Sequence, residues 1–93
     1  YLTPDERKQA ATLYRSLLAA RTAWQSGVTD AATLVARVRD VLEDAPLMTP
    51  EYIELVDDDD LQPLARVPEG SKALLAAAVH LGRARLIDNI ELG

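Results

Sequence analysis

Cysteine is absent from this 93-residue sequence, and so is phenylalanine. The first absence excludes disulfide bonds and zinc sites with cysteine ligands. The second leaves four aromatic side chains, Tyr1, Tyr14, Trp24 and Tyr52. The core must therefore be built from Leu, Val, Ile and Ala.

Positive charge is also scarce. Ten Lys and Arg residues face fifteen Asp and Glu residues, which gives a net charge of −5. Binding to a nucleic-acid backbone needs a clustered Lys/Arg surface, so we expect no nucleic-acid partner.

No apolar run approaches the roughly 20 residues of a membrane helix, and no signal-peptide pattern opens the chain. We therefore expect no membrane partner and a cytoplasmic location. The phosphate-binding loops GxxxxGK(S/T) and GxGxxG are missing as well.

What is present is the composition of one small globular domain spanning residues 1–93. Hydrophobic residues make up 48% of the chain and charged residues 27%, which is ordinary for a soluble protein. A chain of this size buries only about 60–65% of the surface that it exposes when unfolded, so we expect modest stability. It starts at Tyr1 rather than Met, and we expect a processed product or a piece of something longer.

The opening stretch, YLTPDERKQAATLYRSLLAARTAWQSG, predicts a long helix. Thr3 is a natural N-cap, Pro4 fits the first helical position and Glu6 completes a capping box. Gly27 is a C-terminal stop. Helical spacing predicts one buried face, made of Ala10, Leu13, Tyr14, Leu17, Leu18, Arg21 and Trp24.

A second helix is predicted in the next stretch, TDAATLVARVRDVLEDA. Thr29 or Asp30 caps its start, and Pro46 ends it because the residue before a proline avoids the helical region. Its predicted buried face consists of Ala31, Leu34, Val35, Val38, Val41, Leu42 and Ala45. The short connection between the two helices favours an antiparallel pair.

The pattern then becomes extended. MTPEYIELVDDDDLQPL predicts a short strand over Tyr52–Val56, with Ile53 and Leu55 on one side, ended by four aspartates and a proline. SKALLAAAVHLG stays open between two structures on its residues alone. Its Ala and Leu favour a helix with Gly82 as C-cap, whereas a strand buried on both faces would put Gly82 in a turn before RLIDNIEL.

Several polar features allow a site, and each also has a structural interpretation. The run Asp57–Asp60 offers carboxylates for Mg²⁺ or Ca²⁺, but it lacks EF-hand spacing and we favour a solvated turn. Catalysis by His80, the only histidine, would need a nucleophile or an orienting carboxylate nearby, so a sheet or surface role is favoured.

Two further pairs of side chains allow either a ligand-binding or a structural interpretation. Arg83 and Arg85 could grip a phosphate, although structural ion pairs with the nearby Asp88 and Glu91 are favoured. Trp24 and Tyr14 could stack a ligand, although helical spacing favours core positions for both.

Three motifs taken together resemble one family. The patterns are Tyr-Leu-(Ser/Thr)-x-(Glu/Asp)-x-Arg, Tyr-(Ile/Val/Leu)-Glu-(Leu/Ile)-Val-Asp and Leu-Gly-x-x-Arg-Leu-Ile-Asp-Asn. The matching residues are Tyr1, Leu2, Thr3, Asp5 or Glu6, Arg7, Tyr52 to Asp57, Leu81, Gly82, Arg85, Leu86, Ile87, Asp88 and Asn89. In order and spacing across essentially all 93 residues, the chain resembles the C-terminal domain of pantoate–β-alanine ligase, also called pantothenate synthetase.

The resemblance implies an α+β fold. Two N-terminal antiparallel helices would pack on a small antiparallel sheet of about three strands that ends in a β-hairpin. It implies strand, turn and strand for roughly Ala73–Leu92, with Gly82–Ala84 as the turn. It also implies that Asp88 and Asn89 are structural hydrogen-bonding residues. Family members often carry Arg at the His80 position and a polar turn such as Pro-Glu-Thr at residues 58–60, so neither feature is implied to be catalytic.

For function, the resemblance implies an ATP- and Mg²⁺-dependent ligase of coenzyme A biosynthesis. Pantoate is adenylated with release of pyrophosphate, and the amine of β-alanine then attacks the acyl adenylate, giving pantothenate and AMP. The resemblance also implies that an N-terminal Rossmann-like domain, with a His-x-Gly-His motif, supplies most of the active site and that the present chain is its lid-like partner.

The resemblance gives no residue of this chain a catalytic, cofactor-binding or metal-binding role. We expect the isolated fragment to be inactive, to hold no cofactor of its own, and to expose an apolar patch through which it can self-associate. The alternative is a free-standing, non-catalytic interaction module of the same fold.

Overall fold

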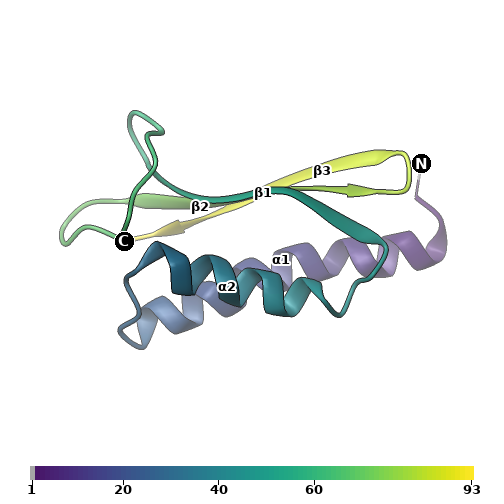
Figure 1. The fold of residues 1–93 in the computed structure, drawn as a ribbon, viewed down its shortest axis with the longest axis horizontal. Coiled ribbons are helices and arrows are strands. Elements are labelled where there is room, and N and C mark those ends of the chain that lie inside the picture. Colours follow the sequence, from purple (N-terminus) through teal and green to yellow (C-terminus); the bar gives the residue numbers. More distant parts are fainter. Residues whose placement is uncertain (1) are drawn as a thin grey trace.

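The computed structural model describes residues 2–93 and shows two layers, helices below and a sheet above (Figure 1). Along the chain the elements are α1 (Pro4–Gln25), α2 (Ala31–Leu42), β1 (Met48–Asp57), β2 (Ala73–Leu81) and β3 (Ala84–Leu92). The helices run antiparallel along one face of an antiparallel sheet with the order β1-β2-β3. The predicted α+β class, helix pair and three-stranded sheet ending in a hairpin are confirmed. Tyr1, the first residue of the N-terminal motif, lies outside the described residues.

The start of α1 is fixed by the predicted capping box. The backbone N–H of Glu6 donates to the Thr3 hydroxyl over 3.1 Å, and the backbone N–H of Thr3 donates to the Glu6 carboxylate over 3.0 Å. Two donors that the first helical turn leaves unpaired are satisfied in this way. The helix stops after Gln25, and Gly27 follows with a φ of 113°, as predicted for a glycine stop.

The start of α2 is capped by Asp30, one of the two predicted candidates. Its carboxylate accepts the backbone N–H of Thr33 over 2.9 Å. The side-chain hydrogen bond from the Thr33 hydroxyl, together with this backbone bond, lowers the pKa of Asp30 below its ordinary value. The helix ends at Leu42 rather than at the predicted Ala45, because the Ala45 N–H bonds to the carbonyl of Leu42 and tightens the chain into a turn.

The buried face of α1 differs from the predicted one. Tyr14 is 49% exposed, so its prediction as a core residue was wrong. The face is instead completed by small residues, Ser16 and Ala20, which a hydrophobic pattern does not select. The Ser16 hydroxyl donates to the backbone carbonyl of Leu13 over 2.5 Å, so it can be buried without leaving an unpaired polar group.

The core lies between the helices and the sheet. Its fully buried large side chains, all of them Leu or Val, are Leu17, Leu34, Val38, Leu75, Val79, Leu81 and Leu92. In β2 the small side chains of Ala77 and Ala78 are both inaccessible, although they point to opposite faces. The alanine-rich run is therefore a strand, as the resemblance implied and contrary to its local helix preference, and it is fully buried only on the face towards the helices.

Three strand boundaries differ from the prediction, the smallest difference being the end of β1 at Asp57 rather than Val56. β1 begins at Met48 rather than Tyr52, because a bulge at Glu51 lets pairing with β2 continue past Pro50. The hairpin turn consists of Gly82 and Arg83 alone, so β3 begins at Ala84. Gly82 has a φ of 59°, as at the first turn position of a type II′ hairpin. The turn therefore favours glycine, and a Cβ atom there would also force the Glu6 carboxylate of α1 to move.

Candidate functional site

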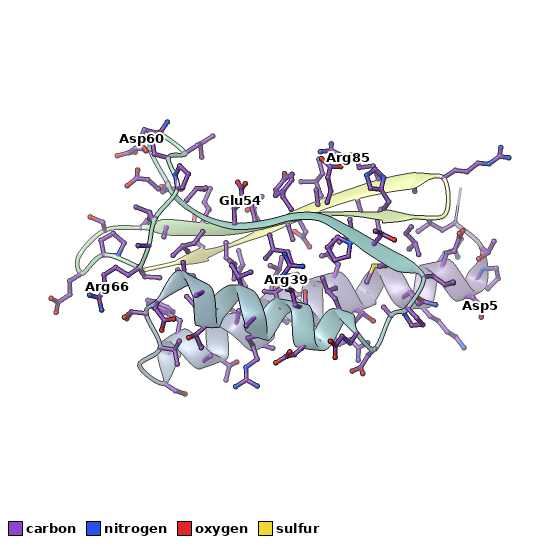
Figure 2. All side chains as sticks on the ribbon, in the orientation of Figure 1. Asp5, Arg39, Glu54, Asp60, Arg66 and Arg85 are labelled. Atoms are coloured by element: carbon purple, nitrogen blue, oxygen red, sulfur yellow. The ribbon has the colours of Figure 1, made fainter. Side chains whose placement is uncertain are left out.

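A cluster of three charged or titratable side chains lies on the sheet face that the helices leave uncovered. Glu51 comes from the bulge in β1, His80 from β2 and Arg85 from β3. The Arg85 guanidinium donates to both carboxylate oxygens of Glu51, through Nε over 2.8 Å and through Nη2 over 3.0 Å. The Nε2 atom of His80 lies 2.9 Å from Oε1 of the same carboxylate. Figure 2 shows Arg85 on the side of the sheet opposite the helices.

The bulge positions this cluster. Pro50 pairs with Val79 and Tyr52 pairs with Ala78, so Glu51 is the extra residue between two paired positions. His80 and Arg85 are direct cross-strand partners on the same face. An extra residue turns its side chain away from the regular alternation, which brings the carboxylate within reach of both the His80 ring and the Arg85 guanidinium. The bidentate bond from Arg85 lowers the pKa of Glu51, and the same bond raises the pKa of Arg85.

The predicted ion-pair partners of Arg85 were wrong. Asp88 lies on the opposite face of β3 because side chains alternate along a strand, and Glu91 lies at the far end of that strand. Glu91 instead lies near Lys72, with Oε2 3.9 Å from Nζ. Arg83 occupies the hairpin turn with an exposed side chain. The general prediction of a structural ion pair at Arg85 is confirmed with Glu51 as its partner.

The cluster has the geometry of a structural network rather than of a catalytic triad. A triad needs a nucleophile bonded to the histidine, with an acid on the other ring nitrogen. Among the described residues, the only contact of this kind made by His80 is with Glu51, whose carboxylate is already held by Arg85. What the cluster can do is tie the beginning of β1 to the hairpin, over a sequence separation of 34 residues.

The aspartate run forms the turn after β1, as predicted. One oxygen of the Asp57 carboxylate accepts the backbone N–H groups of Asp59, over 2.8 Å, and Asp60, over 3.3 Å. The Asp60 carboxylate accepts the N–H of Gln62 over 3.0 Å. Two of the four carboxylates are therefore engaged by the turn itself. No group of three or more side chains that could hold a metal ion occurs between residues 2 and 93.

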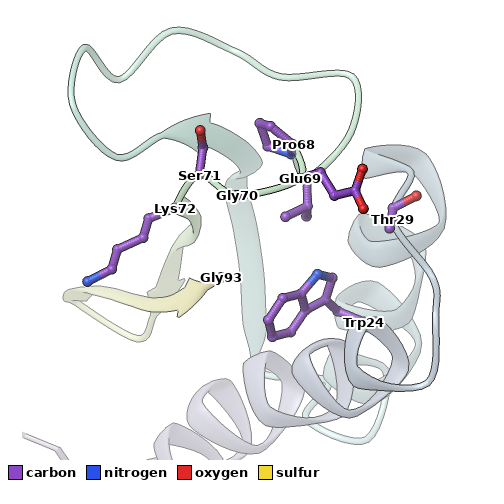
Figure 3. Close-up of a pocket in the computed structure, with 9 residues that line it drawn as sticks. Trp24, Thr29, Pro68, Glu69, Gly70, Ser71, Lys72 and Gly93 are labelled. Atoms are coloured by element: carbon purple, nitrogen blue, oxygen red, sulfur yellow. The ribbon is translucent and has the colours of Figure 1, made fainter.

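A cleft of about 420 Å³ lies between the end of α1, the loop before β2 and Gly93, the residue that follows β3 (Figure 3). The Trp24 indole and the Pro68 ring line it, with Glu69 and Lys72 at its rim. Trp24 is only partly buried and packs against the hydrophobic core from outside it, so its predicted core position is met in part. The cleft thus combines an apolar wall with polar side chains that include Thr29 and Ser71.

Sequence reasoning missed Glu51. The available signal was Pro50, because a proline inside an extended run marks an edge strand or a bulge. The partners of Glu51 could not be read from the sequence, since they depend on the register of all three strands.

No helix within residues 2–93 is long and apolar enough to cross a membrane.

Comparison with known proteins gives one consistent result. A family model described as pantoate–β-alanine ligase matches residues 1–91. The chain is 50% identical over 93 residues to the pantothenate synthetase of Oleidesulfovibrio alaskensis, covering 99% of this chain and 32% of that protein. It is 49% identical over 92 residues to the bifunctional pantoate ligase/cytidylate kinase of Synechococcus elongatus, covering 99% of this chain and 17% of that protein.

The fold agrees with these relatives. The crystal structure of pantothenate synthetase from Thermus thermophilus superposes with a TM-score of 0.81 at 33% identity, covering 97% of this chain and 32% of that one. The chain thus spans about a third of the single-function relatives and less than a fifth of the bifunctional ones. Sequence motifs, fold and family model agree over nearly the whole chain, which therefore belongs to the pantoate–β-alanine ligase family.

Proposed function

We propose that this chain is the C-terminal, lid-like domain of an ATP-dependent ligase that condenses pantoate with β-alanine to form pantothenate, a step of coenzyme A biosynthesis in the cytoplasm. One observation carries the proposal. The family model matches residues 1–91, yet the chain spans only 32% of the pantothenate synthetase to which it is 50% identical. A piece that is wholly recognisable but covers a third of its relatives is best explained as one domain of the enzyme.

The proposed reaction proceeds through a pantoyl adenylate. Its activation step needs the pantoate carboxylate aligned with the α-phosphate of ATP, and it needs the charge that develops there to be stabilised. When bound, ATP with Mg²⁺ supplies the activated phosphate. The described residues form neither a phosphate loop nor a cluster of metal ligands, so we assign nucleotide binding to an N-terminal Rossmann-like domain.

The contribution of the present chain is to cover the cleft. A domain that closes over an acyl adenylate excludes water and so protects the intermediate from hydrolysis until β-alanine attacks. The helix pair is committed to one face of the sheet, which leaves the other face available for this purpose (Figure 1).

The uncovered sheet face carries an apolar row suited to domain docking. Tyr52, Ala78 and Ile87 are cross-strand neighbours on β1, β2 and β3. Ala78 is inaccessible between its larger neighbours, whereas Ile87 is 56% exposed although it lies in a regular strand. We propose that this row contacts the nucleotide-binding domain of the same enzyme. In the isolated chain it supports weak self-association.

The first test is an assay of the purified 93-residue chain with ATP, pantoate and β-alanine, followed by mass-spectrometric detection of pantothenate and AMP. We expect neither product, because the adenylating groups are assigned to the other domain. The complete Oleidesulfovibrio alaskensis enzyme serves as the positive control. Pantothenate formed by the 93-residue chain alone would overturn the division of labour.

The second test concerns the docking row. Sedimentation equilibrium at high protein concentration should show weak self-association that Ile87→Ser reduces. Leu47→Ser changes a residue of similar exposure, 53%, in the turn before β1 and outside the apolar row, and should leave the association unchanged. A strictly monomeric wild-type chain would refute the proposed self-association.

A further inference from the structure

β3 is an edge of the sheet. The strand order is β1-β2-β3, so β3 pairs with β2 on one side and, among the described residues, has no strand on the other. The hairpin closes at Leu81 and Ala84 across two turn residues, which makes that pair hydrogen-bonded in both directions. By alternation, the residues whose backbone N–H and C=O groups point away from β2 are Arg85, Ile87, Asn89 and Glu91.

This edge is complementary to itself. In an antiparallel two-fold pairing of β3 with a second copy, centred on Asp88, Arg85 would lie opposite Glu91 and Ile87 opposite Asn89. These positions carry the outward backbone groups, so they would form the hydrogen-bonded pairs of the new ladder. On the helix side, Leu86 would lie opposite Ile90. Opposite charges and paired apolar side chains both favour strand association.

One residue opposes this pairing. Asp88 stands at the centre of β3 and is half-buried on the helix side of the sheet. At the two-fold axis its carboxylate would meet the carboxylate of the second Asp88 in a non-hydrogen-bonded pair, where side chains come closest. Like charges directly opposite each other destabilise a ladder. A shift of the register by two residues removes the charge pair, but it leaves the carboxylate against Leu86 or Ile90 of the other copy.

Asp88 also accepts a hydrogen bond from a backbone N–H group that a second strand would need as a donor. Its Oδ1 atom accepts the backbone N–H of the adjacent Asn89 over 2.9 Å. Asn89 is one of the residues whose N–H points outward from the edge. A pairing strand would have to break this bond and remove the carboxylate from water at the same time.

We propose that Asp88 guards the free edge of β3 against pairing with a second copy of this chain. An inward-pointing charge in an edge strand is a known way to prevent edge-to-edge association. Here the charge stands at the one position that spoils an otherwise complementary edge. This role of Asp88 does not depend on the apolar row on the sheet face, so it would still hold if the ligase proposal failed.

The test compares self-association of the wild-type chain with that of Asp88→Val by sedimentation velocity. Valine favours strands and removes the carboxylate, so we expect association to strengthen by about tenfold or more. Asp88→Lys should behave like the wild type, because a charge of either sign blocks the edge. Asp40→Val makes the same substitution on the exposed side of α2 and should leave association unchanged.

A second substitution locates the contact. Asn89→Pro, added to Asp88→Val, removes an outward donor at an edge where proline is tolerated, and should restore the wild-type state. Hydrogen exchange should show the amides of Ile87 and Glu91 unprotected in the wild type and protected in associated Asp88→Val.

Asp88→Asn, which keeps the size of the side chain, tests the charge alone if the valine variant fails to fold, and should also strengthen association. If the valine variant associates no more than the wild type, or the proline does not reverse its association, the proposal is wrong. Should the valine variant not fold, the asparagine variant decides in its place.

Discussion

The two alanines at the centre of β2 give a sharp test of the two-layer packing. Ala77 is inaccessible and belongs to the core between the sheet and the helices, whereas Ala76 is half-buried on the opposite face. Leucine in place of Ala77 adds three carbon atoms where the helices leave no space. Overpacking of this kind costs typically about 1–3 kcal/mol. Leucine in place of Ala76 extends towards solvent, where substitutions usually change stability by no more than about 0.5 kcal/mol.

The size of this effect relative to the whole chain makes it measurable. At about 0.05–0.15 kcal/mol per residue, a chain of this length has a free energy of unfolding of about 5–14 kcal/mol. For a domain of 60–100 residues, 1 kcal/mol shifts the melting temperature by about 4–8 °C. A loss of about 2 kcal/mol in Ala77→Leu would therefore lower it by about 8–16 °C.

The assay is urea and thermal unfolding followed by the fluorescence of Trp24, the only tryptophan, with far-ultraviolet circular dichroism as a second probe. We expect Ala77→Leu to be clearly less stable than the wild type and Ala76→Leu to be close to it. Equal losses in the two variants, or a larger loss in Ala76→Leu, would refute the assignment of these neighbours to opposite faces of a strand.

Three further predictions follow from individual contacts. Leu17→Ala empties a fully buried site and should cost about 2–5 kcal/mol in chemical denaturation, whereas Leu47→Ala, at a half-exposed site, should cost far less. Gly82→Ala should destabilise the chain in the same assay, because the positive φ disfavours a Cβ atom and the capping-box carboxylate of α1 would be forced to move. The lowered pKa of Glu51 means that its contribution to stability is present above the ordinary carboxyl value of 4.5 and is lost as pH falls through its folded-state pKa. Arg85→Met should therefore raise the pKa of Glu51 in a nuclear magnetic resonance titration, and the stability difference from the wild type should shrink in acid; an unchanged titration would contradict the bidentate pair.

Local signals predicted those parts of the fold that depend on neighbouring residues. The helix starts were predictable because capping chemistry acts over three residues, as Thr3 with Glu6 and Asp30 with Thr33 show. The buried face of α1 was predicted only in part. Its small polar and apolar members, Ser16 among them, are selected by close packing and not by hydrophobicity.

Other parts depend on contacts that residue patterns do not reveal. The alanine-rich run of β2 fits a helix or a strand on its own, and only the family resemblance favoured the strand, which the sheet then confirmed. The Glu51 cluster unites residues from three strands and depends on a single bulge. Its acidic member was not predicted, and the predicted partners of Arg85 were on the wrong face or at the wrong end of β3.

The proposed docking face and the guarded edge are adjacent surfaces with opposite roles. The apolar row of Tyr52, Ala78 and Ile87 would receive another domain, whereas Asp88 would keep the edge of β3 free of a second copy. Ile87 contributes its side chain to the first surface and its backbone to the second, which is why the substitutions at Asp88 and Asn89 are needed to separate them.

The most direct measurement of the proposed function is the activity of a chimera. The matching segment of the Oleidesulfovibrio alaskensis pantothenate synthetase, 50% identical, would be replaced by this chain, and pantothenate formation from ATP, pantoate and β-alanine would be measured. Misplacement of reacting groups by about 1 Å costs about a hundredfold in rate. If this chain docks as the native segment does, that loss is avoided, and we predict turnover within about tenfold of the parent enzyme. The parent without this segment should be inactive. A folded chimera no more active than the truncated parent would contradict the assignment and favour a free-standing interaction module.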